Sequence, residues 1–151
     1  MATYVNDLRL KEIGTGESSG TWGTETNVNL ELIGEAMGYA TKAVADASTS
    51  TITMPDGTAT GGELRSLYLK LTGGGQASTV TLAPNTVSKV WFIENATSYT
   101  LTFTMGSGAN VAVLAGQTKS IASDGAGSGA ALYDVMTDLS VAGDFFVANT
   151  I

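Results

Sequence analysis

Between residues 48 and 139, apolar and polar residues alternate, and turn-forming residues interrupt the alternation at short intervals. In the segment YTLTFTM, residues 99–105, the side chains of Tyr99, Leu101, Phe103 and Met105 would share one face of a strand, opposite three threonines. Turn signals lie close by, among them PDG at 55–57, GGG at 73–75 and GSG at 106–108. This pattern leaves no room for long helices and predicts about eight short strands.

Strands that bury only one face need a second layer to cover it. The hairpin-like spacing of the turns favours antiparallel pairing, so we expect an antiparallel, jelly-roll-like β-sandwich over residues 48–139. The segment KVWFIEN at 89–95 is apolar for most of its length, which is typical of a central strand covered on both faces. We therefore interpret Trp91 as a core residue and not as a platform for stacking sugars.

Residues 1–47 follow a different pattern. A short strand-like piece at 4–10 leads into a loop rich in Gly, Thr and Ser, and residues 41–47 read as a weakly helical link. Between them, apolar residues recur at the spacing of one helix face: Val28, Leu32, Ile33, Ala36 and Met37. We expect an arm with one short helix of about three turns ahead of the sandwich.

The ends of this helix have candidate caps. Thr26 or Asn27 is a suitable N-cap, because a short polar side chain there accepts a hydrogen bond from a free backbone N–H. Gly38 is a suitable residue just beyond the C-cap. The caps place Trp22 in the loop before the helix.

Residue types that are absent exclude several kinds of site. The chain of 151 residues has no Cys and no His, which removes thiolate metal sites, the commonest general base and the commonest zinc ligand. No pair of carboxylates is placed for glycosidase chemistry, and no calcium-binding series accompanies Asp56 or Asp124, which we interpret as turn residues. We therefore expect a protein that is not an enzyme and that has no cofactor or metal.

The charge balance bears on the partners. Seven Lys and Arg against 14 Asp and Glu give a net charge of −7, so the cationic footprint that a nucleic-acid partner requires is missing. No apolar run approaches the roughly 20 residues that span a bilayer, and the N-terminus lacks the apolar stretch of a signal peptide. We expect a protein made in the cytoplasm, with neither nucleic acid nor membrane as a partner.

The last segment, SVAGDFFVANTI at 140–151, reads as a strand, a turn and a second strand. A hairpin alone is marginally stable in water, so its apolar residues need cover from other chains. This predicts contacts between copies in an oligomer, through Phe145, Phe146, Val147 and Ile151.

Residues 4–41, and most specifically the motif GTWG-x-x-x-N-x-N-L at 20–30, resemble the N-terminal region of tail fibres and related virion structural proteins of marine tailed bacteriophages. Residues 91–127 are similar to the β-module that follows, and residues 139–151 to the start of a repetitive shaft. The resemblance covers nearly all of the chain.

This resemblance implies a virion protein made in the host cytoplasm: the N-terminal part of a homotrimeric tail fibre. Residues 1–47 would attach it to another virion protein such as a tail adaptor or nozzle, residues 48–139 would form the sandwich, and residues 140–151 would begin the shaft. A capsid decoration or head-fibre protein using the same attachment module is the alternative within the virion. A carbohydrate-binding β-sandwich is the alternative of another class.

The arm supplies the candidate docking residues: Trp22, Asn27, Asn29, Leu30, Ile33 and Met37. The indole of Trp22 is either an anchor buried in a neighbouring chain or part of a small local core formed with the helix. The amides of Asn27 and Asn29 either bond a partner's backbone or cap the helix. Glu31 and Glu35 lie on the outward helix face, where they are either solvated or opposite a basic patch on a partner.

Overall fold

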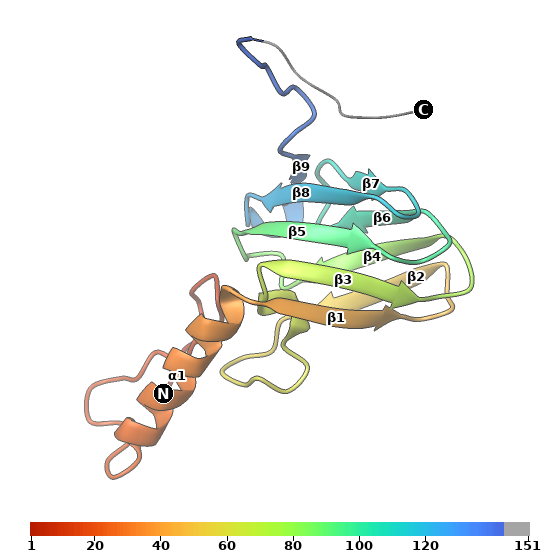
Figure 1. The fold of residues 1–151 in the computed structure, drawn as a ribbon. Helices are drawn as coiled ribbons and strands as arrows, with labels where there is room; N and C mark the ends of the chain where they lie inside the picture. Colours follow the sequence, from red (N-terminus) through yellow and green to blue (C-terminus); the bar gives the residue numbers. More distant parts are fainter. Residues whose placement is uncertain (144–151) are drawn as a thin grey trace.

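The computed structural model describes residues 1–143, in which nine strands form two sheets packed face to face (Figure 1). One helix, α1, precedes them, and two short 3-10 turns lie in the connections. The elements are α1 Trp22–Ala36, β1 Tyr39–Val44, β2 Thr49–Thr53, η1 Glu63–Arg65, β3 Tyr68–Gly73, β4 Ser78–Ala83, β5 Val90–Asn95, β6 Leu101–Thr104, β7 Val111–Val113, β8 Thr118–Ser123, η2 Gly127–Gly129 and β9 Leu132–Asp134. The prediction of a mainly β protein with one helix is confirmed.

The chain passes back and forth between the two sheets. One sheet has the order β1-β3-β5-β8-β9 and the other β2-β4-β6-β7. β1, β3 and β5 pair in parallel, as do β2, β4 and β6, so the first six strands form three stacked coils with one strand in each sheet. β7, β8 and β9 then add to the sheets in antiparallel pairs.

The predicted antiparallel pairing is therefore wrong for much of the fold, and a jelly roll is not confirmed. Both sheets are mixed, with four parallel and three antiparallel pairings among the described strands. The turn at 73–75, which suggested a hairpin, connects β3 in one sheet to β4 in the other. A short turn between two sheets carries the same Gly and Asn signals as a hairpin turn within one sheet.

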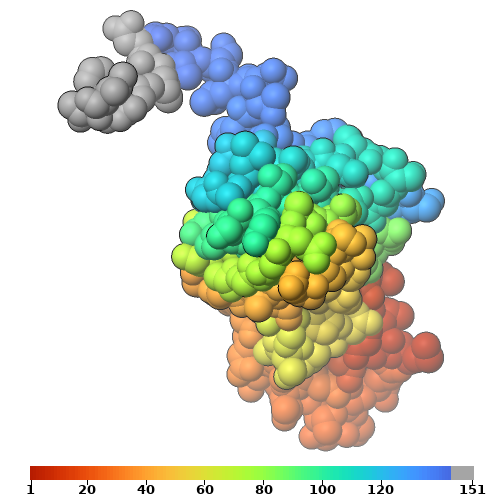
Figure 2. Space-filling model, turned by 90° about the vertical axis from the view of Figure 1, so that its right-hand side faces the viewer, coloured from red at the N-terminus to blue at the C-terminus, as the bar shows by residue number. Residues whose placement is uncertain are grey.

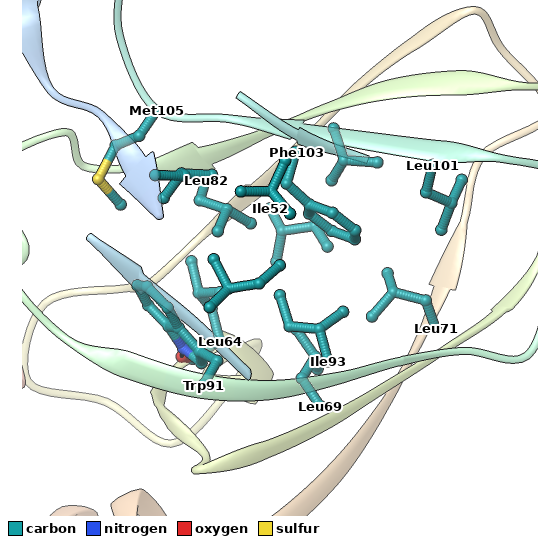
Figure 3. Close-up of a cluster of buried hydrophobic side chains, with 14 of the residues drawn as sticks. Ile52, Leu64, Leu69, Leu71, Leu82, Trp91, Ile93, Leu101, Phe103 and Met105 are labelled. Carbon is teal, nitrogen blue, oxygen red and sulfur yellow. Dashed lines mark hydrogen bonds between the residues drawn. The ribbon is translucent and has the colours of Figure 1, made fainter. Parts of the chain in front are cut away.

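The core lies between the sheets and is built by the alternation of each strand (Figure 3). Leu69 and Leu71 from β3 meet Val80 and Leu82 from β4, and all four side chains are fully buried. Trp91 is a core residue as predicted, and its indole Nε1 donates to the Leu64 carbonyl at 2.7 Å. Burial of such side chains stabilises the fold by about 1.5–3 kcal/mol each.

β5 differs from its prediction as a strand covered on both faces. Its residues alternate, with Trp91 and Ile93 buried and with Val90 and Phe92 on the outer face of the sheet. Phe92 continues a row of rings there, because it pairs with Tyr68, and Tyr68 pairs with Tyr39. The outer face of the five-stranded sheet is therefore open at these residues of the described chain.

The segments before the sheets also differ from expectation. Residues 41–47 are not a helical link, because β1 occupies Tyr39–Val44 as the edge strand of the five-stranded sheet and lies within the segment 1–47. Residues 4–10 are not a strand: an isolated bridge joins Thr3 to Glu12 across a turn. The alternation in 4–10 thus belongs to a loop that folds onto the rest of the arm.

α1 begins at Trp22, earlier than predicted, and has 15 residues. Its N-cap is Thr21, so Thr26 and Asn27 lie inside the helix and do not cap it. The C-cap is Met37, and Gly38 follows it as predicted, with its N–H bonded to the Glu35 carbonyl at 2.9 Å. In the space-filling view the N-terminal residues form a lobe at one end of the sandwich, opposite the last described residues (Figure 2).

Candidate functional site: the N-terminal arm

α1 extends away from the sheets, and residues 1–20 run along one side of it (Figure 1). On that side Leu32 and Ala36 are buried. Asn29 joins the two segments, because its amide donates to the Lys11 carbonyl at 2.8 Å and accepts from the Lys11 N–H at 3.0 Å. The Lys11 ammonium lies 2.6 Å from the Glu25 carboxylate, and this contact together with a hydrogen bond from Ser18 lowers the pKa of Glu25.

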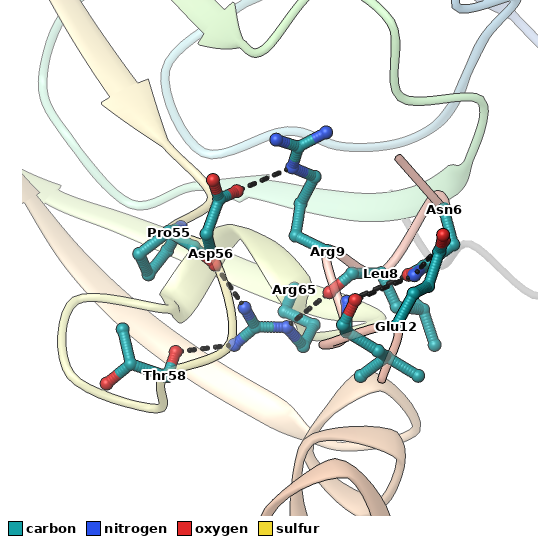
Figure 4. Close-up of polar contacts among 9 residues, drawn as sticks. Asn6, Leu8, Arg9, Glu12, Pro55, Asp56, Thr58 and Arg65 are labelled. Carbon is teal, nitrogen blue, oxygen red and sulfur yellow. Dashed lines mark hydrogen bonds and ion pairs between the residues drawn. The ribbon is translucent and has the colours of Figure 1, made fainter. Parts of the chain in front are cut away.

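Arg65 fastens the arm to the sandwich (Figure 4). Its side chain is fully buried in η1, between the arm and the connection from β2 to β3. Nε donates to the Leu8 carbonyl at 2.9 Å, Nη2 to the Pro55 carbonyl at 2.6 Å and Nη1 to the Thr58 carbonyl at 3.1 Å.

The charge of Arg65 is balanced by Glu35 of α1, whose carboxylate lies 3.5 Å from Nη1. Burial lowers the pKa of the guanidinium, and Glu35 opposes that effect. A buried guanidinium is tolerated only when its donors are satisfied, and here three backbone carbonyls and one carboxylate satisfy them. The geometry therefore fixes the direction of the arm relative to the sheets.

Three further contacts join the arm to the sandwich. Arg9 pairs with Asp56 at 2.7 Å, and the Gly57 N–H donates to the Arg9 carbonyl at 2.8 Å. Gly57 has a φ of +57°, and a Cβ there would lie 2.6 Å from the ring of Tyr4. The backbone N–H of Ser88 donates to the Asp7 carboxylate at 2.8 Å. The arm is thus held at several points along its length.

The adjacent side of α1 carries exposed apolar side chains. We call Trp22, Leu30, Ile33 and Met37 the α1 stripe; 65%, 60%, 42% and 75% of these residues are exposed. At about 100° per residue they lie within about 80° of each other around the helix axis. The structure therefore brings four of the six predicted docking residues onto one face.

The other two predicted docking residues lie elsewhere. Asn29 is used inside the arm by Lys11, and Asn27 lies farther round the helix, on its exposed surface. The interpretation of Trp22 as part of a local core is wrong, because most of the residue is exposed. Its role as an anchor in another chain remains a prediction. Phe145, Phe146, Val147 and Ile151, the predicted trimer contacts, lie outside the described residues.

Sequence reasoning missed Arg65. A single Arg in the segment GGELRSLYL gives no sign that it is buried, and burial depends on chain segments far apart in the sequence.

Hollows of about 230 Å³ beside Tyr39 and about 250 Å³ beside Tyr4 flank the arm. The first is lined by Glu35 and Glu63. Each carboxylate has a cation beside it, because Glu35 lies 3.5 Å from Arg65 and Glu63 lies 3.2 Å from Lys42.

No family model, curated protein or solved structure matches the chain. Within residues 1–143 no three acidic side chains gather into a group that would hold a metal ion. The same residues contain no helix with the length and apolar character needed to cross a bilayer.

Proposed function

We propose that the chain is a structural protein of a tailed-phage virion, the N-terminal part of a homotrimeric tail fibre whose arm attaches the fibre to the tail. The observation that supports this function best is the α1 stripe. Its four large apolar side chains are exposed on a helix that is itself fastened to the sandwich by Arg65. Apolar surface of this kind is typical of a contact with another protein chain.

The surroundings of the stripe support a docking role over a catalytic one. No ionisable residue lies on that side of α1: Glu31 and Glu35 are on other sides, and Glu25 faces Lys11. A rigid support lowers the entropy lost when an interface forms. Trp22 and Met37, the two most exposed residues of the stripe, are of types that are enriched in interfaces between proteins.

The test is the substitution Trp22→Ala in the complete protein, followed by immunoblotting of purified virions. Loss of an aromatic anchor typically weakens an interface by about 2 kcal/mol or more, which is about thirtyfold in affinity. We expect incorporation to fall by at least tenfold, with an unchanged circular dichroism spectrum because the indole is exposed in the free chain. Thr24→Ala, on another side of α1, is the matched control.

Normal incorporation of Trp22→Ala would contradict the docking role of the arm.

Electron micrographs of virions labelled with antibody against the chain would show where in the particle the chain lies. Label at the tail supports the fibre, and label over the capsid supports the decoration protein. Labelling of neither, together with glycan binding by the purified chain, would favour the carbohydrate-binding alternative.

A further inference from the structure

The two sheets differ in the residues on their outer faces. The strands of the four-stranded sheet, β2, β4, β6 and β7, contain no charged residue, although the chain has seven Lys and Arg and 14 Asp and Glu. The five-stranded sheet carries the ion pair of Lys70 and Glu94 on its outer face and exposes Tyr39 and Phe92. Strands of the same coils therefore tolerate charges and rings, so β propensity alone does not account for the uncharged face.

The outer face of the four-stranded sheet is a two-dimensional array of threonines. Two rows cross β2, β4 and β6, which lie side by side in Figure 1, and we call their six residues the threonine face: Thr49, Thr79 and Thr102 in one row and Thr51, Thr81 and Thr104 in the other. All six are exposed or half-buried, because the residues between them, such as Val80 and Phe103, are buried in the core.

Parallel pairing in register makes this array a grid. Neighbouring strands lie about 4.8 Å apart, and alternate residues of one strand lie about 6.6 Å apart. The grid continues without charge beyond the first row, where a hollow of about 140 Å³ beside Thr79 and Thr102 is lined by Ser, Thr and Ala alone. The threonine face is thus a periodic surface and not a scatter of polar residues.

The side chains of the threonine face are stiff, and most of their hydroxyls are free to bind water. Branching at Cβ restricts χ1, so each hydroxyl and each methyl group keeps a fixed position. Within residues 1–143, only the Thr104 hydroxyl bonds to the protein, donating to the Gly106 carbonyl at 3.2 Å. The other five hydroxyls can each donate one hydrogen bond and accept two.

These properties select a ligand that is itself periodic and uncharged. A mineral or a charged polymer would need charged side chains, and a sugar polymer would need aromatic rings; the threonine face has neither. On the planar faces of hexagonal ice, water molecules repeat at spacings close to those of the grid, and every molecule donates and accepts hydrogen bonds. Charged groups would hold water in orientations that an ice face does not have, so their absence suits the same ligand.

We propose that the threonine face binds ice, with the hydroxyls in positions of the water lattice and the methyl groups between them. This binding site goes beyond the proposed function and shares no residue with the α1 stripe. Six threonines form a small site. The expected activity is therefore adsorption to ice and slower growth of large ice grains, with little depression of the freezing point.

The test uses the purified full chain, labelled with a fluorophore on its lysines, none of which lies in the four-stranded sheet. A single ice crystal grown slowly in the solution should take up the labelled chain on defined crystal planes and exclude a labelled globular protein of similar size. In a second assay, the chain should slow the coarsening of small ice grains held just below the melting point.

Thr81→Lys places a charge at the middle of the grid. The hydrated ammonium holds the neighbouring hydroxyls away from the crystal, so uptake into ice should fall roughly tenfold or more. Thr72→Lys is the matched control, because Thr72 is a half-buried threonine on the outer face of β3, a central strand of the other sheet, and uptake should stay at the wild-type level. Thr51→Lys, on the edge strand β2, should give the same loss with less effect on folding, because edge strands accommodate lysine.

A wild-type chain that is excluded from ice overturns the inference, and so does uptake that survives both Thr81→Lys and Thr51→Lys. Wild-type chains that associate in analytical ultracentrifugation and separate on Thr81→Lys, without uptake into ice, would show that the face is a contact between copies instead. The proposed function fails separately: Trp22→Ala should leave uptake into ice unchanged, and Thr81→Lys should leave incorporation into virions unchanged.

Discussion

Replacing Arg65 with methionine should release the arm while leaving the sandwich folded. Methionine replaces the unbranched stem of arginine, but it has no donors for the carbonyls of Leu8, Pro55 and Thr58. A hydrogen bond to a charged donor contributes about 1.5–3 kcal/mol, and such contributions are not additive. Loss of the ion pair adds less, because the Glu35 side chain left behind is 38% exposed and stays partly solvated.

The cost should fall mainly on the arm, because Arg65 contacts Leu8 and Glu35 there, and its other partners lie in the connection between β2 and β3. We expect the free energy of opening the arm to fall by about 3 kcal/mol or more, because three backbone carbonyls lose a charged donor. Since 1.4 kcal/mol corresponds to a factor of ten, hydrogen exchange of the α1 amides should accelerate by roughly a hundredfold or more. Exchange in β3 to β6 should change much less.

Arg9→Met is the matched control. Arg9 also joins the arm to the connection through Asp56, but the Asp56 side chain is 48% exposed, and such pairs are worth at most about 1 kcal/mol. Hydrogen exchange followed by mass spectrometry compares both variants with wild type. Unchanged α1 exchange in Arg65→Met, or equal effects of the two variants, would refute the role assigned to Arg65.

Three further outcomes are expected. Asn95→Ala should lower the free energy of unfolding by about 2–3 kcal/mol in urea titrations, because the buried side chain makes four hydrogen bonds. Ser98→Ala, at an exposed position of the following turn, is the control and should leave it nearly unchanged. Burial lowers the pKa of the Lys89 ammonium from 10.5 to about 8. Between these pH values the folded chain has lost the proton and the unfolded chain still holds it, so the free energy of unfolding should rise with pH. Lys89→Met should remove this part of the pH dependence. Gly62→Ala should lower the melting temperature and loosen the arm, because its Cβ would lie 2.5 Å from Nη1 of Arg65.

Alternation in the sequence predicted much of the core. Tyr99, Leu101, Phe103 and Met105 were expected on one face; the last three are buried, whereas Tyr99 precedes β6 and is exposed. Strand direction was not accessible in this way, because a strand buries the same alternate residues whether its neighbour is parallel or antiparallel. The signal that was available is a repeat: Tyr68 pairs with Phe92, 24 residues later, and Ser78 with Leu101, 23 residues later. Such a spacing is typical of stacked coils.

The arm was predicted less completely for a different reason. Leu32 and Ala36 are buried and Ile33 and Met37 exposed, yet all four are apolar and lie on adjacent sides of one helix. The sequence shows a wide apolar arc, and only the path of residues 1–20 decides which part of it the chain covers itself. Periodicity alone therefore identified the docking candidates without separating them from the buried side.

The support of the arm comes from an irregularity in the coils. Tyr39 pairs with Tyr68, 29 residues later, against 24 in the next coil, and the connection at 54–67 is longer than the corresponding one at 84–89. The longer connection holds Pro55, Asp56 and Thr58, together with Arg65 in η1. A coil of regular length would close the core but would have no residues to bind Leu8 or Arg9. Met54 and Leu64 of this connection belong to the core, whereas the polar residues between them bind the arm. The longer connection thus joins the arm to the sandwich, and a fixed arm is what the proposed docking role requires.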